Sequence, residues 1–319
     1  MRLFILTLLV FFGLEAKEHA IVYIESTGEH SNCVNNSIRQ AKYFNHSTPV
    51  YFIGSKAKYK KNADFFTDND VYFVDIQTLK KGKLYQDLKK NFLGPIESSL
   101  SNVTLDELKV SLLDFAIFYE FLRQFPLRNV FYMSHKNMIY ISLEEVLDQF
   151  FKNDKVYLAN YNFSCASKNF LFVKDASVLD KIVTEFYEKD FQSLEAVLGR
   201  CALKKSGYVE HLSVVPKEYL AWIKAAGKDE DFGSTNPYRG AVDYKNVLFD
   251  PGIHSAFCSA FKYPVACGGG PCFVAEDFNY TWEDDHEGRR IPYLIYGQKK
   301  YKLANLNFNC DSVEPFLSK

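Results

Sequence analysis

Short apolar runs alternate with longer amphipathic segments along the first half of the chain. Residues 20–25 (AIVYIE) form a continuous apolar run, which is typical of a strand buried on both faces of a parallel sheet. Such runs predict further strands, most of them before residue 175. These lie at residues 50–53, 71–75, 130–133, 138–141, 155–158, 169–173, 247–251, 293–296 and 300–303.

Apolar positions three and four residues apart predict helices between these strands. They cover residues 32–44, 142–150 and about 192–204. Two further helices are indicated by capping residues, Thr104 with Glu107 and Ser177 with Asp180. The connection between the strands at 50–53 and 71–75 is polar and lysine-rich, and residues 224–244 form a long surface loop. The order of elements predicts one α/β domain with its ligands at the carboxyl ends of the strands.

Composition excludes some classes of protein. The chain has 319 residues, of which 47% are hydrophobic, so it is globular and can bury one large core. Its 38 lysines and arginines nearly balance its 39 aspartates and glutamates, and no basic block stands out. We therefore expect no nucleic-acid partner.

The amino-terminal residues have the layout of a secretory signal. Arg2 precedes an apolar run from Leu3 to Leu14, and the small residue Ala16 follows. The run is shorter than the roughly 20 residues that a membrane anchor needs. We expect a signal peptide at 1–16, a mature domain at 17–319, no membrane span after cleavage, and a location outside the cell or in the secretory lumen.

Two other features agree with export. Five N-x-[ST] triplets predict a glycoprotein with glycan acceptors on exposed loops; the asparagines are Asn35, Asn45, Asn102, Asn162 and Asn279. The seven cysteines allow up to three disulfide bonds, whose pairing is open. Cys267 and Cys272 bracket the turn-forming sequence GGGP, so a local disulfide between them is the preferred pair.

Several segments together resemble a known family. They are VFYMSHKNMIYISLEEVL, VYLANYNFSCASKNFLFVKDASVLDKIVTEF, VLFDPGIHSAF and IPYLIYGQKKYKLANLNFN. In order and spacing they resemble glycosyltransferases of the nucleotide-diphospho-sugar transferase superfamily. The resemblance implies a single A-type glycosyltransferase-like domain, with a mixed, mostly parallel sheet flanked by helices. It also implies a nucleotide sugar as donor and a glycan or protein as acceptor.

The sequence departs from this family at the residues that hold a metal. Where the family has acids after a strand, this chain has Ser134, His135, Lys136 and Asn137, and where its last motif has histidines it has asparagines. A lysine about 4 Å from a metal costs on the order of 4 kcal/mol at an effective dielectric constant of about 20. We therefore expect no cofactor, and Mn²⁺ or Mg²⁺ only if other acids supply ligands.

Two interpretations of this loop stay open. In the first, Lys136, with His135, neutralises a phosphate directly, which would give a metal-independent transferase. In the second, the site is inactive and the protein is a secreted pseudoenzyme that acts as a binding or host-interaction module. The loss of two separate motifs favours the second interpretation.

Other candidate residues come from the ends of predicted strands. Glu25, Ser26 and Thr27 follow the first strand, where this fold contacts the nucleotide, although a helix-entry turn explains them equally well. Asp250 and Asp243 are candidate acceptor-side carboxylates, but an aspartate before Pro-Gly is more often a turn residue. The acidic run after Trp282 is either an acceptor-side lid or a solvated loop.

Overall fold

A seven-stranded sheet forms the centre of the computed structural model, which describes residues 19–26, 32–92, 102–150, 154–160, 166–188, 209–219, 246–250, 252, 278–308 and 317. The strand order is β3-β2-β1-β4-β7-β6-β8. Neighbouring strands are parallel, except that β7 is antiparallel to both β4 and β6. The bounds are β1 Ala20–Ile24, β2 Val50–Gly54, β3 Val71–Asp75, β4 Val130–Met133, β6 Val156–Asn160, β7 Ala166–Val173 and β8 Val209–His211.

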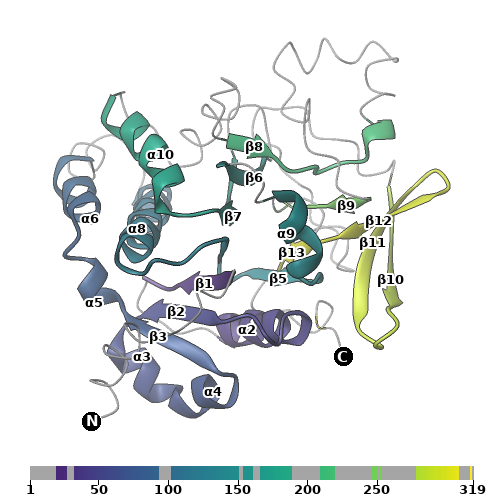
Figure 1. Cartoon of the computed structure of the whole chain (residues 1–319), viewed down its shortest axis with the longest axis horizontal. Helices are drawn as coiled ribbons and strands as arrows, with labels where there is room; N and C mark the ends of the chain where they lie inside the picture. Colours follow the sequence, from purple (N-terminus) through teal and green to yellow (C-terminus); the bar gives the residue numbers. More distant parts are fainter. Residues whose placement is uncertain are drawn as a thin grey trace.

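Helices flank this sheet, as Figure 1 shows. Side chains of β1 alternate between two cores: Ile21 and Tyr23 pack on the side of α2, whereas Val22 and Ile24 pack on the side of α8 and α10. The predicted mixed, mostly parallel α/β sheet flanked by helices is thus confirmed. The helices are α2 Asn32–Phe44, α3 Lys56–Lys61, α4 Ala63–Asp68, α5 Ile76–Leu79, α6 Lys83–Asp87, the π-helix η1 Leu88–Phe92, α8 Asn102–Gln124, α9 Glu144–Phe150 and α10 Ala176–Glu188.

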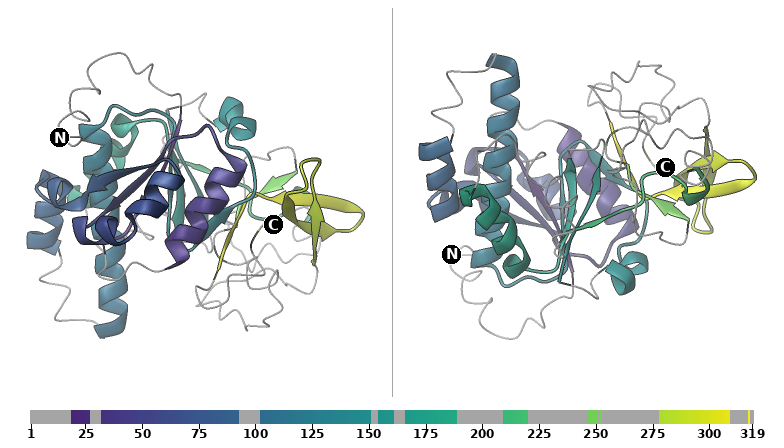
Figure 2. Two further views of the ribbon diagram at one scale, coloured as in Figure 1. Left: turned by 90° about the horizontal axis from the view of Figure 1, so that it is seen from below. Right: turned by 90° about the horizontal axis from the view of Figure 1, so that it is seen from above.

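Two smaller sheets extend the domain. One has the order β10-β11-β12-β9, and the other is a ribbon of β13 and β5. The β10–β11 hairpin projects away from the central sheet (Figure 2). The bounds are β5 Asn137–Ile139, β9 Val247–Leu248, β10 Asn279–Asp284, β11 Arg290–Tyr296, β12 Lys299–Leu303 and β13 Asn305–Asn307.

Some predicted loops are regular structure. The lysine-rich connection contains α3 and α4, because Ser55 caps α3 and Phe66 of α4 is buried against the sheet. Trp282 to Asp284, predicted as a lid or a solvated loop, belong instead to strand β10. Trp282 stacks edge-on against Tyr140, with the two ring centroids 5.6 Å apart. Packing of Trp282 therefore makes this segment a strand, although its charges indicated a loop.

The presence of helices was predicted better than the residues at which they begin. α8 begins at Asn102, so the predicted cap Thr104 lies inside the helix. α10 begins at Ala176, and its capping carboxylate is that of Asp175, which accepts from Ser177 N at 2.9 Å. The predicted cap Ser177 is thus a helical residue. The predicted helix at 192–204, the loop at 224–244, and Cys267 and Cys272 lie outside the described residues.

Cys33 in α2 is buried. In the part of the chain that the structure describes, no helix combines the length and the apolar character needed to cross a bilayer.

Gly82 gives a test of the packing between α6 and α8. A Cβ atom at Gly82 would lie 2.0 Å from Cδ of Glu120, whose buried carboxylate accepts from Leu84 N at 2.8 Å. The carboxylate can retreat only by losing that hydrogen bond. We expect Gly82→Ala to lower the free energy of unfolding by about 1 to 3 kcal/mol, measured by urea denaturation.

Glu120→Ala supplies the control for this packing test. The combined variant should lose less stability than the sum of the two single variants, because the second change removes the clash. Strict additivity would contradict the packing described here.

Candidate functional site

The chain reverses its direction of winding between β1 and β4. From β1 it proceeds outward to β2 and β3, and it then returns to β4 on the other side of β1. The carboxyl ends of two parallel strands at such a reversal leave a crevice in which α/β proteins bind their ligands. Glu25 and Ser26 follow β1 here, and Ser134, His135 and Lys136 follow β4. We call these five residues the switch-point site.

A buried ion pair lies at this site. Lys58 Nζ is 2.8 Å from Glu25 Oε1, and the two side chains are only 9% and 4% exposed. Glu25 N also donates to Ile53 O at 3.0 Å, so β2 fixes the residue's backbone. Loss of one partner would leave the other charge buried, which makes such a pair costly to break. Glu25, a predicted donor-binding residue, is therefore paired with Lys58, which lies in the connection predicted to be polar.

His135 is a half-buried neutral imidazole near this ion pair. Burial lowers the pKa of His135 below its ordinary value, and Lys136 lowers it further; Glu25 opposes this effect and Lys58 adds to it. The backbone is fixed because Ser37 Oγ donates to His135 O at 2.8 Å. With no anion bound, His135 can donate or accept a hydrogen bond at neutral pH. Its predicted share in neutralising a phosphate stays a prediction.

Lys136 is the exposed cation of the switch-point site. Its backbone oxygen accepts from Phe308 N at 2.9 Å, which ties the loop to the carboxyl end of β13. Among the residues that the structure describes, no group of three or more His, Cys, Asp or Glu side chains is placed to hold a metal. Lys136 is thus the described cation placed to meet an anionic ligand at this site.

The amide side chains of Asn305 and Asn137 form a buried network with the backbone of Asp250 behind the loop. Asn305 Nδ2 donates to Asn137 Oδ1 at 3.0 Å and to Asp250 O at 2.9 Å, and Asn305 Oδ1 accepts from Asp250 N at 3.1 Å. All three residues are buried. Asn137, a predicted donor-binding residue, therefore orients the loop from inside.

Both carboxylate oxygens of Asp250 accept hydrogen bonds from backbone N–H groups. Its Oδ1 accepts from Gly252 N at 2.8 Å and its Oδ2 accepts from Asn307 N at 3.3 Å. The carboxylate closes the turn after β9 and is 1% exposed. This geometry agrees with the turn interpretation of Asp250, and its part in acid–base chemistry stays a prediction. The other predicted carboxylate, Asp243, and the donor-binding candidate Thr27 lie outside the described residues.

Several polar atoms at the same place are buried without a hydrogen-bond partner. They are Ser26 Oγ, Ser134 Oγ, and both Nδ2 and Oδ1 of Asn307. Ser26 and Ser134 follow neighbouring strands, and Asn307 pairs with Asn137 in the β13–β5 ribbon. Buried polar groups are nearly always hydrogen-bonded, so four such atoms in one region indicate a place where a polar ligand or water completes the bonding. Asn307 is one of the asparagines that stand where the last motif of the resembled family has histidines.

The expected glycan acceptors differ in their surroundings. Asn45 is buried; its Nδ2 donates to Ile141 O at 3.2 Å and its Oδ1 accepts from Leu143 N at 2.6 Å. The expectation that Asn45 lies on an exposed loop is wrong, because its amide holds the segment before α9. Asn35 is half-buried inside α2, Asn102 begins α8, and Asn279 is exposed. Asn162 lies outside the described residues.

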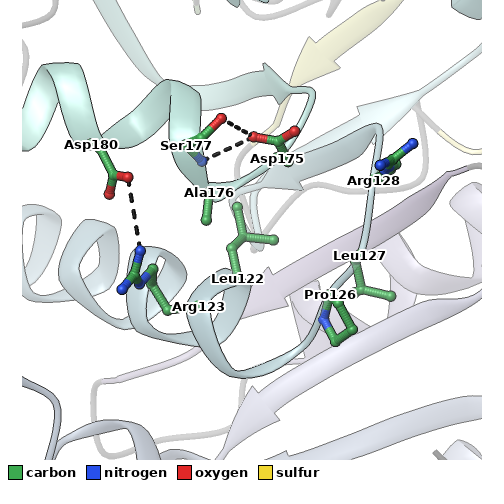
Figure 3. A pocket seen from close by; sticks show the side chains of 9 residues that line it. All are labelled: Leu122, Arg123, Pro126, Leu127, Arg128, Asp175, Ala176, Ser177 and Asp180. Carbon is green, nitrogen blue, oxygen red and sulfur yellow. Dashed lines mark hydrogen bonds and ion pairs between the residues drawn. The ribbon is translucent and has the colours of Figure 1, made fainter.

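A separate pocket of about 350 Å³ opens at the opposite end of β4 (Figure 3). Arg123 and Asp180 form an ion pair on one side of it, with Nη1 and Oδ2 3.8 Å apart, and Asp175 accepts from Ser177. Two arginines and two aspartates give it no net charge, so we assign it no role. Its lining residues are Leu122, Arg123, Pro126, Leu127, Arg128, Asp175, Ala176, Ser177 and Asp180.

The charges around His135 give a test of the site's electrostatics. Because Lys136 lowers the pKa of the imidazole, Lys136→Ala should raise that pKa toward its ordinary value. Proton NMR titration of the histidine ring signals, assigned with His135→Gln, measures the change. Lys89→Ala removes an exposed lysine on η1 and should leave the His135 signal unmoved.

The same lowered pKa makes stability depend on pH with a definite sign. The unfolded chain binds a proton at about pH 6.5, whereas the folded chain binds it only at a lower pH. His135 therefore costs stability as the pH falls below about 6.5 and through the folded pKa. His135→Gln should flatten this part of the stability profile, and an unchanged slope would contradict the assignment.

Of the comparisons with known proteins, the one with solved structures gave matches. No protein-family model matches the sequence, and no curated protein matches it. Mouse xyloside xylosyltransferase 1 is similar in structure with a TM-score of 0.44 and 9% identity, over 71% of this chain and 96% of that one. The galactosyltransferase LgtC, solved with donor and acceptor sugar analogues, gives 0.35 and 12%, over 70% and 84%. The 4-diphosphocytidyl-2C-methyl-D-erythritol synthase of Anaerococcus prevotii gives 0.33 and 9%, over 67% and 97%.

Proposed function

We propose that this chain is a glycosyltransferase-like protein that binds a nucleotide-linked sugar at the switch-point site. The observation that carries the proposal is the group of buried, unpartnered polar atoms on Ser26, Ser134 and Asn307. Hydroxyl and amide groups can each donate and accept hydrogen bonds, which matches the hydroxyls of a sugar. The position between β1 and β4 is where an α/β sheet binds its ligand.

The charges favour binding without a metal. Lys58 is committed to Glu25, so Lys136 is the described lysine at the site that is exposed to an incoming diphosphate. An ammonium and a phosphate form a charge-assisted hydrogen bond, which is stronger than a neutral one. A bound Mn²⁺ or Mg²⁺ would need carboxylates from elsewhere, and Lys136 would repel it.

A second candidate function is that of a binding module without catalysis. Two carboxylates near the site have structural partners: Glu25 is paired with Lys58, and both Asp250 oxygens accept backbone N–H groups. A general base must reach the proton that it removes, and neither group is presented for that. This observation favours a pseudoenzyme that binds a nucleotide sugar, or a host partner, and transfers nothing.

We further propose that the protein works in the secretory lumen or outside the cell, on a glycan or protein acceptor if it transfers sugar. The apolar run from Leu3 to Leu14 and the N-x-[ST] triplets support this location. Amino-terminal sequencing of the protein made in eukaryotic cells should find a mature chain that starts near Lys17. An intact Met1 would contradict export by signal cleavage.

Binding of a nucleotide diphosphate tests whether the switch-point site binds a nucleotide-linked sugar without a metal. Isothermal titration calorimetry should detect binding in the absence of Mn²⁺, and Lys136→Ala should weaken it by roughly 1 to 3 kcal/mol, the scale of a lost charge-assisted contact. Lys89→Ala is the matched control, because Lys89 is also exposed and lies away from the switch point. Ser134→Ala should weaken binding of the nucleotide sugar more than binding of the diphosphate alone.

The outcomes separate the two functions. Binding with measurable sugar release or transfer supports the transferase, and binding without turnover supports the module. If millimolar nucleotide gives no heat in any variant, the nucleotide-sugar proposal fails. If binding appears only with Mn²⁺, the metal-independent site proposed here is wrong.

A further inference from the structure

Five lysines follow one another between the end of α5 and the middle of η1. Figures 1 and 2 show α5 and α6 at one edge of the molecule, beside α8 and away from the β10–β11 hairpin. All five lysines are exposed except Lys80, which is half-buried. We call them the lysine cluster; they are Lys80, Lys81, Lys83, Lys89 and Lys90.

Apolar side chains fix this segment to the domain. Every apolar side chain from residue 76 to residue 90 is buried in the core on the side of α8. α6 and η1 follow each other without a break. Lys83, Gln86 and Lys90 are spaced three and four residues apart along this helical stretch, and all three are exposed, so they share its outward face. The buried residues are Ile76, Leu79, Leu84, Tyr85 and Leu88.

The positive charge of this segment is not balanced within it. Residues 76–92 contain five lysines and one acid, Asp87, in a chain whose formal net charge is −1. No ion pair joins a lysine of the cluster to another residue that the structure describes. Glu120, the acid behind α6, is buried and accepts from Leu84 N at 2.8 Å. The cluster therefore presents an excess of positive charge to the solvent.

The other lysine-rich segment, α3, differs in this respect. Lys56 Nζ lies 3.2 Å from Asp75 Oδ2, and Lys58 is buried with Glu25. Residues 62–70 add three aspartates directly after the helix. Nearby acids thus balance the charge of α3, which leaves the lysine cluster as the segment with uncompensated charge.

We propose that the lysine cluster binds a linear sulfated polysaccharide. Sulfate groups carry a fixed negative charge, and an ammonium group binds such an anion as a point charge. Lys83 and Lys90 are seven residues apart, which is about 10 Å at roughly 1.5 Å per helical residue. A row of this kind can meet successive sulfates along a chain. Lysine-rich segments are a general feature of heparin-binding surfaces.

Two other polyanions fit the cluster less well. Single-stranded nucleic acids are bound by exposed aromatic rings on which the bases stack. Tyr85 is only 6% exposed, and Lys80 Nζ lies 5.9 Å from the centroid of its ring. Stable binding to a membrane surface needs an inserted apolar group besides basic residues. The apolar side chains of residues 76–90 are all buried, so none is presented for insertion.

The inference goes beyond the nucleotide site and rests on the proposed location outside the cell, where sulfated polysaccharides occur. Its test is calorimetric titration of the full chain with a heparin oligosaccharide. Lys83→Ala combined with Lys90→Ala should weaken binding about tenfold at low ionic strength. The affinity of this variant should also fall less steeply with added salt, because fewer counterions are released on binding.

The matched control removes two exposed lysines from the other side of the sheet. Lys60 and Lys61 are exposed on α3, and α3 and α4 pack on the side of α2. Lys60→Ala with Lys61→Ala should keep the affinity for heparin within about twofold. Lys83→Arg with Lys90→Arg keeps the charge and should also keep the affinity. Lys136→Ala should leave heparin binding unchanged, which separates this surface from the switch-point site.

Each contrary outcome overturns the proposal. An equal loss in the two alanine pairs would mean that binding follows overall charge and not this cluster. A similar loss in Lys136→Ala would place the polyanion at the switch-point site. Binding of desulfated heparin with the same affinity would exclude sulfate as the recognised group. Tighter binding to phosphatidylserine vesicles or to single-stranded DNA would assign the cluster to a membrane or a nucleic acid. No heparin binding at low ionic strength would leave the cluster without the proposed partner.

Discussion

The side chain of Asn305 joins three distant parts of the chain, and the position of the switch-point loop depends on it. Its amide nitrogen donates to Asn137, which is 168 residues away, and its amide group also makes two bonds to the backbone of Asp250. Asn305 is fully buried, so water cannot replace these bonds without opening the core. The loop after β4 is therefore held from behind by neutral amides, and its outward side is left for a ligand.

The charges of the site follow from this arrangement. Glu25 and Lys58 neutralise each other in a dry environment, and they act on His135 with opposite signs. Burial then keeps the imidazole neutral, so Lys136 contributes the positive charge that faces outward. A site of this kind attracts an anion by one lysine and orders it by neutral hydrogen bonds. Salt screens the attraction between this one exposed lysine and a diphosphate. The affinity should therefore fall as the ionic strength rises.

The sequence predicted the central sheet because strands such as β1 and β4 are buried on both faces. The apolar runs at 20–25, 50–53, 71–75 and 130–133 all became strands with nearly the same bounds. It failed where a distant contact overrides local chemistry. The start of α9 depends on Asn45 holding Leu143 N, and strand β10 depends on Trp282 packing against Tyr140. The Glu25–Lys58 pair escaped prediction for the same reason, because a lysine in a polar segment carries no sign of burial.

The pairing of β13 with β5 sets the order in which the molecule can assemble. β1, β2, β3 and β4 all lie within the first 133 residues and can pair soon after that part is synthesised. β13 begins at Asn305, which is synthesised 168 residues after Asn137. The hydrogen bond between the two side chains can form only after more than half the chain has been translated in between. Pairing of residues so far apart in sequence is slow. The proposed ligand site therefore cannot be complete before Asn305 is synthesised, when the strands β1 to β4 are already present.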